Sequence, residues 1–187
     1  AVATDVRLPG ECQRLVEAAT AEFGRLDVMI NNAGLAVYGP IGSMTPDDVD
    51  AMVDTNVKGL IWCSQAAAHV MKAQRRGLII NISSIAGKLH LVNESVYGAT
   101  KWAVNGFSGA LRAELAPFGV KVTVVCPGGI HTPFWDAQEF LPFPDHVDPA
   151  RDFMAPEEVA QSVLEVALKS DRYCVPEVVM VPMIPAP

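Results

Sequence analysis

The sequence predicts an α/β protein with a doubly wound, mostly parallel sheet, on the strength of two observations. Short apolar runs of strand length alternate along the chain with segments whose apolar residues recur at helical spacing. Most strand runs are apolar throughout, which is typical of strands that helices cover on both faces. We therefore expect three layers, with helices above and below one sheet.

Length and composition indicate one domain, residues 1–187, with a sizeable core. Of the 187 residues, 50% are apolar and 19% are charged, which is normal for a globular domain. The net charge of −7 argues against a nucleic-acid partner, because phosphate binding needs a basic face. The chain has no uninterrupted apolar run of about 18 residues, so we expect no membrane span. The four cysteines are widely spaced, which favours reduced thiols in a cytoplasmic protein.

Four helices are predicted from apolar spacing and from residues that start or stop helices. The first opens at Pro9 and ends at Gly24, a residue type common after helix ends. The second has Thr45 as its N-cap and Pro46 in its first turn, and it runs past Met71. The other two cover residues 96–118 and 156–168.

The predicted strands are residues 2–4, 26–30, 78–82, 122–125 and 178–181. Residues 131–155 form a long loop rich in Phe, Trp and Pro. Two interpretations fit that composition. The loop could be a lid over an apolar substrate, or its aromatic residues could pack it onto its own domain.

The residues capable of chemistry fall at predicted strand ends or on neighbouring helices. Asn31-Asn32-Ala33-Gly34 ends one strand, either as a turn that lets a ligand approach the backbone or as an ordinary Asn-rich turn. Tyr97 and Lys101 stand four residues apart, on one helix face. Ser84 follows the next strand and precedes the tyrosine by 13 residues. Asn56 lies within a helix, where an amide needs hydrogen-bond partners.

Together these motifs resemble the short-chain dehydrogenase/reductase family. The matching segments are Asn31-Asn32-Ala33-Gly34, Asp54-Thr55-Asn56-Val57, Asn81-Ile82-Ser83-Ser84, Tyr97-Gly98-Ala99-Thr100-Lys101 and Pro127-Gly128-x-Ile130-x-Thr132. The Asn-Asn-Ala-Gly form resembles the single-domain branch of that family. The resemblance implies a Rossmann-like fold and an NAD(P)-dependent oxidoreductase. Such an enzyme interconverts a carbonyl and an alcohol on a small-molecule substrate by hydride transfer.

The resemblance implies a catalytic set of Asn56, Ser84, Tyr97 and Lys101. Tyr97 would be the acid/base, because hydride transfer to a carbonyl leaves an oxygen that needs a proton. A free tyrosine has a pKa of about 10, and the charge of Lys101 would lower it. Ser84 would hydrogen-bond the substrate oxygen. Asn56 would anchor a water that links Lys101 to solvent.

The resemblance also implies contacts with the cofactor and the substrate. The cofactor-binding set is Asp5, Val6, Asn32, Ala33, Gly34, Ile82, Tyr97, Lys101, Pro127, Gly128, Ile130 and Thr132. Asp5 could instead simply cap the helix that follows it. His90 and Asn93 would border the substrate beside the catalytic serine and tyrosine, although a position in a solvated loop explains them equally well. The histidines show no metal-ligand spacing, so we expect no metal.

One part of the family pattern is not present in the sequence. The family opens with a strand, a Gly-rich turn, a helix and a second strand, and none of these precedes Ala1. We expect that about 50 to 60 residues, roughly two strands, are missing. Strand 26–30 would then have an unpaired edge. The residue that separates NAD from NADP is missing too, so that choice stays open. The alternative to an enzyme is a non-catalytic fragment or scaffold that cannot bind the dinucleotide.

Small residues on one predicted helix indicate an oligomer. Trp102, Gly106, Ala110 and Ala113 share the face of helix 96–118 that is turned away from Tyr97. Glycine inside a helix costs about 1 kcal/mol relative to alanine, so its presence suggests that another helix approaches closely. We expect a homodimer or homotetramer built on this helix and on the helix that holds Asn56.

Overall fold

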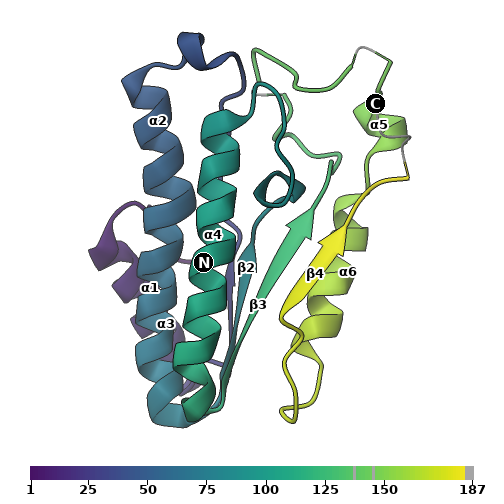
Figure 1. Cartoon of the computed structure of the whole chain (residues 1–187). Helices are drawn as coiled ribbons and strands as arrows, with labels where there is room; N and C mark the ends of the chain where they lie inside the picture. Colours follow the sequence, from purple (N-terminus) through teal and green to yellow (C-terminus); the bar gives the residue numbers. More distant parts are fainter. Residues whose placement is uncertain (137, 145, 184–187) are drawn as a thin grey trace.

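A computed structural model of the chain describes residues 1–136, 138–144 and 146–183. Its centre is a four-stranded parallel sheet with the strand order β1-β2-β3-β4 (Figure 1). The strands are β1 (Val28–Asn31), β2 (Gly77–Ile82), β3 (Val120–Pro127) and β4 (Glu177–Met180). Because all four strands are parallel, their carboxyl ends meet at one edge of the sheet, which is where ligands bind in such folds.

The helices follow the predicted order. They are α1 (Pro9–Phe23), α2 (Pro46–Val53), α3 (Leu60–Gln74), α4 (Ser95–Leu115), α5 (Pro149–Asp152) and α6 (Pro156–Ala167). Gly24 ends α1 with a φ of 74°, a left-handed conformation that suits glycine. Thr45 caps α2 as predicted, and Asp48 completes the capping box by accepting a hydrogen bond from the Thr45 backbone N–H.

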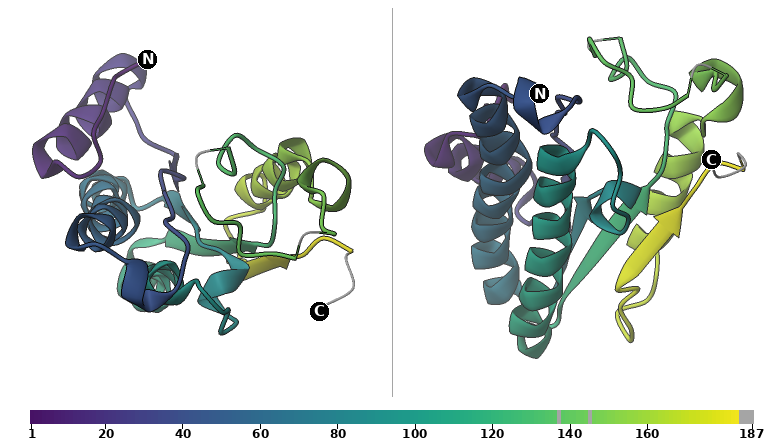
Figure 2. Two further views of the ribbon diagram at one scale, coloured as in Figure 1. Left: turned by 90° about the horizontal axis from the view of Figure 1, so that it is seen from above. Right: turned by 45° about the horizontal axis from the view of Figure 1, so that its top comes forward.

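Helices cover both faces of the sheet, which confirms the predicted three-layer α/β fold (Figure 2). Met29, Ile79 and Val122 point to one face and belong to the core cluster formed with α1, α3 and α4. The alternate strand residues Ile80 and Val125 point to the other face, where Val166 of α6 covers them. This alternation follows from the two-residue period of a strand.

The long second helix was predicted without interruption, but the structure places a π-helical turn, Asp54–Gly59, between α2 and α3. The three segments still run on as one helix in Figure 1. In a π turn the backbone hydrogen bond spans five residues instead of the four of an α-helix, and such turns are frequent at functional sites. Here it contains Asn56, which is 2% exposed.

Two further expectations differ from the structure. Residues 2–4 form no strand, and Val2 is half exposed. A strand needs backbone partners, and β1, the sheet edge nearest in sequence, pairs only with β2 among the described residues. The loop 131–155 also contains a short helix, α5, which Asp148 starts by accepting a hydrogen bond from the Ala150 backbone N–H.

Among the described residues, β1 pairs only with β2 and is an edge strand of the sheet. Ile30 is 47% exposed there, although it is an apolar residue in the middle of a strand run. Within the described residues, no helix is long and apolar enough to cross a membrane.

Candidate active site

The carboxyl ends of β1 and β2 are held in place by a buried polar network. The Asn31 side-chain amide donates to Asn81 Oδ1 at 2.8 Å and to Ser64 Oγ of α3 at 2.9 Å. The Asn81 amide in turn donates to Ser108 Oγ of α4 at 2.8 Å. The sequence showed these asparagines within motifs, but their role in joining strand ends to helices needed the structure. The network fixes the sheet edge relative to α4.

Tyr97 and Lys101 project from one face of α4, and both are buried there, at 8% and 6% exposure. Lys101 Nζ donates to the backbone carbonyl of Ile82, at the end of β2, over 3.2 Å. The same nitrogen lies 5.5 Å from the centre of the Tyr97 ring. Ser84 follows β2, and its hydroxyl is close enough to the Tyr97 side chain to act to lower the pKa of that phenol. The three side chains therefore meet at the carboxyl edge of the sheet, as predicted.

Burial governs the ionisation of these groups. It raises the pKa of Tyr97 to about 12, even though hydrogen bonds with the Ser84 and Tyr38 side chains favour the phenolate. It lowers the pKa of Lys101 to about 8. The sequence predicted that Lys101 lowers the pKa of Tyr97. The structure gives the opposite net direction, because the loss of hydration outweighs the other effects. Tyr97 is protonated at neutral pH and can act as a proton donor.

Asn56 lies beside Lys101 but is largely occupied by protein partners. Its Oδ1 accepts from the Leu35 backbone N–H at 2.9 Å, and its Nδ2 donates to the Leu35 carbonyl at 2.8 Å. Nδ2 also donates to Thr100 Oγ1 at 3.1 Å. A Cβ at Gly34 would lie 3.3 Å from Asn56 Oδ1 and 3.6 Å from Lys101 Nζ. The exposed turn after β1 therefore passes directly over these two catalytic candidates.

Tyr38 is a residue of this site that sequence reasoning missed. It is 7% exposed, and its ring meets the Tyr97 ring edge to face with 5.4 Å between the ring centres. Trp135 of the long loop stacks on Tyr38 at 5.9 Å. Burial raises the pKa of Tyr38 above its ordinary value, so its hydroxyl stays neutral. A buried phenol in the segment directly after a strand's carboxyl end was the signal that could have identified it.

The aromatic residues of loop 131–155 fit both interpretations given above. Trp135 packs on Phe143 and Phe153 of its own loop, and it also stacks on Tyr38 at the site. Its indole N–H donates to the Ile130 carbonyl at 2.7 Å. The loop is closed at its base by a parallel bridge between Ile130 and Met154. It lies above the carboxyl ends of the strands in Figure 1.

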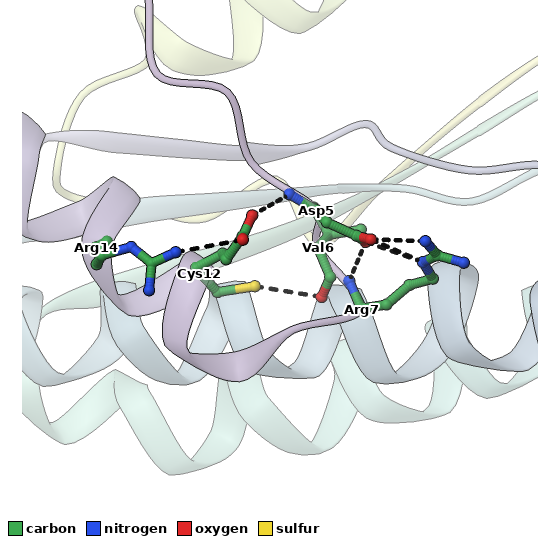
Figure 3. Close-up of polar contacts among 6 residues, drawn as sticks. Asp5, Val6, Arg7, Cys12 and Arg14 are labelled. Atoms are coloured by element: carbon green, nitrogen blue, oxygen red, sulfur yellow. Dashed lines mark hydrogen bonds and ion pairs between the residues drawn. The ribbon is translucent and has the colours of Figure 1, made fainter.

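Asp5 and Val6 are bonded to the first turn of α1 (Figure 3): the Asp5 backbone N–H donates to the Glu11 carboxylate at 2.6 Å, and Cys12 Sγ donates to the Val6 carbonyl at 3.2 Å. The Asp5 carboxylate pairs with Arg7 at 2.6 Å, and hydrogen bonds from Arg7 lower its pKa to about 2. The alternative that Asp5 caps the helix is wrong, because the N-cap of α1 is Leu8. Val6 packs against Gly59, where an added Cβ would come within 2.7 Å of it.

In the segment after β3, several backbone groups form hydrogen bonds with other residues of the chain. Pro127 ends β3, and the Gly128 N–H donates to the Met180 carbonyl at 2.7 Å. The carbonyl of Thr132 accepts from the Trp135 N–H at 3.3 Å. At the end of β1, Asn32 and Ala33 are exposed, like Gly34. These residues stand at the sheet edge where the resemblance placed them.

The two residues expected to border the substrate differ in position. The His90 ring stacks on Trp102 at 5.6 Å and is exposed, so the structure does not bring it to Tyr97. Trp102 belongs to the helix face turned away from the site, so the stacking holds His90 on that side of α4. Asn93 has a φ of 64°, and its carbonyl accepts from the Gly39 N–H at 2.9 Å. This bond holds the segment before α4 beside Tyr38.

Glu94 is the second residue that sequence reasoning missed. It is the N-cap of α4, three residues before Tyr97, and it is 9% exposed. Burial raises the pKa of its carboxyl to about 7, and its charge acts on both Tyr38 and Tyr97. Within the described residues, no group of three His, Cys, Asp or Glu side chains could hold a metal ion.

Comparisons with known proteins agree with this arrangement. The family model for short chain dehydrogenases matches residues 1–139. Oxidoreductase BOA17 of Botryotinia fuckeliana is 40% identical over 131 residues, which cover 70% of this chain and 48% of that protein. A 3-ketodihydrosphingosine reductase of Bacteroides thetaiotaomicron is 41% identical over 66% of this chain and 46% of its own length. The chain thus spans about half of these two relatives.

Solved structures show the same fold. The closed form of a serine dehydrogenase complexed with NADP+ superimposes with a TM-score of 0.84 at 31% identity, covering 95% of this chain and 73% of that one. The fold and the family match define the class as a Rossmann-like α/β protein. The chain belongs to the short-chain dehydrogenase family.

Proposed function

We propose that this protein is an NAD(P)-dependent oxidoreductase that interconverts a carbonyl and an alcohol, with Tyr97 as its acid/base. The observation that carries the proposal is the meeting of Tyr97, Lys101 and Ser84 at the carboxyl edge of the sheet. A lone Tyr-x-x-x-Lys pair is a weak signal. The same pair buried beside a serine at a strand end is the arrangement that such chemistry needs.

Each side chain has a role that its geometry supports. Tyr97 is neutral at pH 7 and holds the proton that the substrate oxygen takes up during reduction. The Ser84 hydroxyl lies beside it and donates to the same oxygen, which stabilises the negative charge that develops there. The Lys101 ammonium would keep the phenolate form accessible after the proton has left. Asn56 would anchor a water that returns a proton by way of Lys101.

The residues present fit a nicotinamide group. Gly34 is exposed and lacks a Cβ; a Cβ there would press on Asn56 Oδ1 at 3.3 Å and would touch Lys101 Nζ at 3.6 Å. The turn after β1 therefore leaves room for a ring or ribose to approach these polar groups. The bound dinucleotide would supply the hydride for the reaction. Contacts would come from the remaining predicted cofactor residues, including Asp5, Val6 and Thr132. The choice between NAD and NADP is left open.

The test is Tyr97→Phe, which removes one hydroxyl and keeps the ring that packs on Tyr38. Turnover of a carbonyl substrate should fall at least about a thousandfold, because proton transfer contributes up to about 10⁴-fold to such reactions. Dinucleotide affinity, measured by fluorescence of the reduced cofactor, should change less than about threefold. Tyr173→Phe is the matched control, since Tyr173 is 51% exposed and distant from the site in sequence. Retention of most activity by Tyr97→Phe would show that the assignment is wrong.

A homo-oligomer in the cytoplasm completes the proposal. Apolar side chains of α3 and α4, among them Trp62, Phe107 and Leu111, line a surface groove between the two helices. A second copy of the chain would cover it. All four cysteines are free thiols, which suits a reducing compartment. The competing proposal, a non-catalytic scaffold, would keep the groove but would show no cofactor-dependent turnover.

A further inference from the structure

Glu94 brings a carboxyl group to the site without a counter-charge among the described residues. Among the described residues, its carboxylate forms no ion pair and accepts no hydrogen bond. The two nearest lysines in the sequence have other partners, because Lys88 pairs with Glu177 and Lys101 donates to the Ile82 carbonyl. No fully buried side-chain oxygen or nitrogen of the described residues lacks a partner. The carboxylate is therefore held in a largely buried position that solvent still reaches.

The position of Glu94 relative to the reacting hydroxyl is set by two backbone contacts. The Gly98 N–H donates to the Glu94 carbonyl at 2.6 Å, which closes the first turn of α4 and places Glu94 one turn before Tyr97. The Gly39 N–H donates to the Asn93 carbonyl at 2.9 Å, which brings Glu94 beside the Tyr38 segment. Side chains one helical turn apart have Cβ atoms about 5 to 6 Å apart. The side chains of Glu94 and Tyr97 therefore start about 5 to 6 Å apart, a distance that a small ligand can bridge.

A buried carboxylate with no cation nearby is energetically unfavourable unless something else pairs with it. Desolvation already raises the pKa of this carboxyl to about 7. The rings of Tyr38, Trp135 and Phe134 pack against one another beside the site and reduce contact with water. In such surroundings an added positive charge interacts more strongly than it would in bulk water. The missing partner is a cation that arrives with a ligand.

We infer that Glu94 binds an ammonium group of the substrate, so that the enzyme acts on amino alcohols and the matching amino ketones. The inference rests on the proposed function, because it takes the carbinol oxygen to lie at Tyr97 and Ser84. An ammonium group one or two carbons from the reacting carbon would bridge the single helical turn between Tyr97 and Glu94. The apolar part of the substrate would lie against the aromatic side chains of loop 131–155. Tyr38 would form the wall of the site beside the ammonium group and the carbinol.

The experiment compares two alcohols of nearly the same shape. Phenylethanolamine has an ammonium group beside its carbinol, and α-ethylbenzyl alcohol has a methyl group in its place. Binding to the full chain is followed by NMR, with NADP+ present, through the indole N–H signal of Trp135. Trp62→Phe and Trp102→Phe identify which indole signal belongs to Trp135. At about pH 8 we expect the amine to bind at least about tenfold more tightly.

Two controls test whether Glu94 is responsible. In Glu94→Gln, a neutral side chain of the same shape, the preference for the amine should vanish at every pH. In Glu22→Gln, which changes the net charge equally on the exposed end of α1, the preference should persist. In the unsubstituted protein the preference should also disappear near about pH 5, where Glu94 is protonated. The comparison of about pH 5 with about pH 8 uses only the unsubstituted protein, so it does not depend on whether Glu94→Gln folds.

Three outcomes would overturn the inference: equal affinity for both alcohols, no amine binding at about pH 8, or a preference that survives Glu94→Gln. Turnover on the same samples separates this inference from the proposed function. If the protein prefers the amine but does not oxidise it with NADP+, Glu94 does bind the ammonium group and the proposed oxidoreductase function is wrong. If both alcohols are oxidised with equal kcat/KM, the oxidoreductase function is correct and the role of Glu94 in substrate choice is wrong.

Discussion

At the scale of single residues, the ionisation of Glu94 links the stability of the fold to pH. The carboxyl titrates at about 7 in the folded protein, raised by burial from its ordinary 4.5. Between these two values the folded chain keeps a proton that the unfolded chain has released. The free energy of unfolding therefore falls as the pH rises through this window and then levels off, by a total on the order of 3 kcal/mol from this group.

Glu94→Gln should remove that dependence, because an amide has no proton to release. We expect the variant to match the unsubstituted protein near about pH 5 and to be more stable than it near about pH 8. Urea unfolding followed by far-UV circular dichroism measures both values, with Glu22→Gln as the control for net charge. Equal pH slopes for Glu94→Gln and the unsubstituted protein would show that Glu94 is not held in an unfavourable environment.

At the scale of elements, the small residues of α4 form an exposed surface. Gly106 and Ala110 are exposed, and a Cβ at Gly106 would meet nothing within 4 Å. Within the described residues, no neighbouring segment of the chain therefore packs on Gly106. With the apolar side chains of the neighbouring groove, the face provides what a close helix-to-helix contact between two copies requires.

Gly106→Glu or Ala110→Glu should leave each chain folded and separate the copies. The new carboxylates would face each other across a two-fold contact and would lose their hydration there. Sedimentation velocity should show a dimer or tetramer for the unsubstituted protein and a monomer for either variant. Far-UV circular dichroism supplies the check that the fold is intact. An unchanged sedimentation coefficient would show that the interface between copies does not include this face of α4.

At the scale of the whole molecule, the open edge of the sheet bears on cofactor binding. β1 is the terminal strand of the sheet, with Ile30 exposed and the Asn32–Gly34 turn in solvent. The 187 residues contain no Gly-rich turn between a strand and a helix N-terminus, the feature that holds a pyrophosphate in dinucleotide-binding folds. The side chains proposed to be catalytic, Ser84, Tyr97 and Lys101, nevertheless lie together at that edge of the sheet.

We expect the 187-residue chain to bind NADH and NADPH weakly, with a dissociation constant above the micromolar range. Loss of several charge-assisted hydrogen bonds to the pyrophosphate corresponds to about 4 kcal/mol, or about a thousandfold in affinity. Calorimetric titration of each cofactor measures this directly. Micromolar binding of either one would show that the residues present are sufficient on their own.

The helices and the parallel sheet could be predicted from the sequence, because they depend on local periodicity, on capping residues and on the rule that parallel strands end at one edge. The grouping of Ser84, Tyr97 and Lys101 was predicted from the family resemblance together with that rule. The surroundings of each group depend on the tertiary structure. It placed Tyr38 and Glu94 beside Tyr97, turned His90 onto Trp102, and gave Tyr97 a raised pKa rather than a lowered one. Burial and the contacts between distant segments set these properties, and neither is encoded in local spacing.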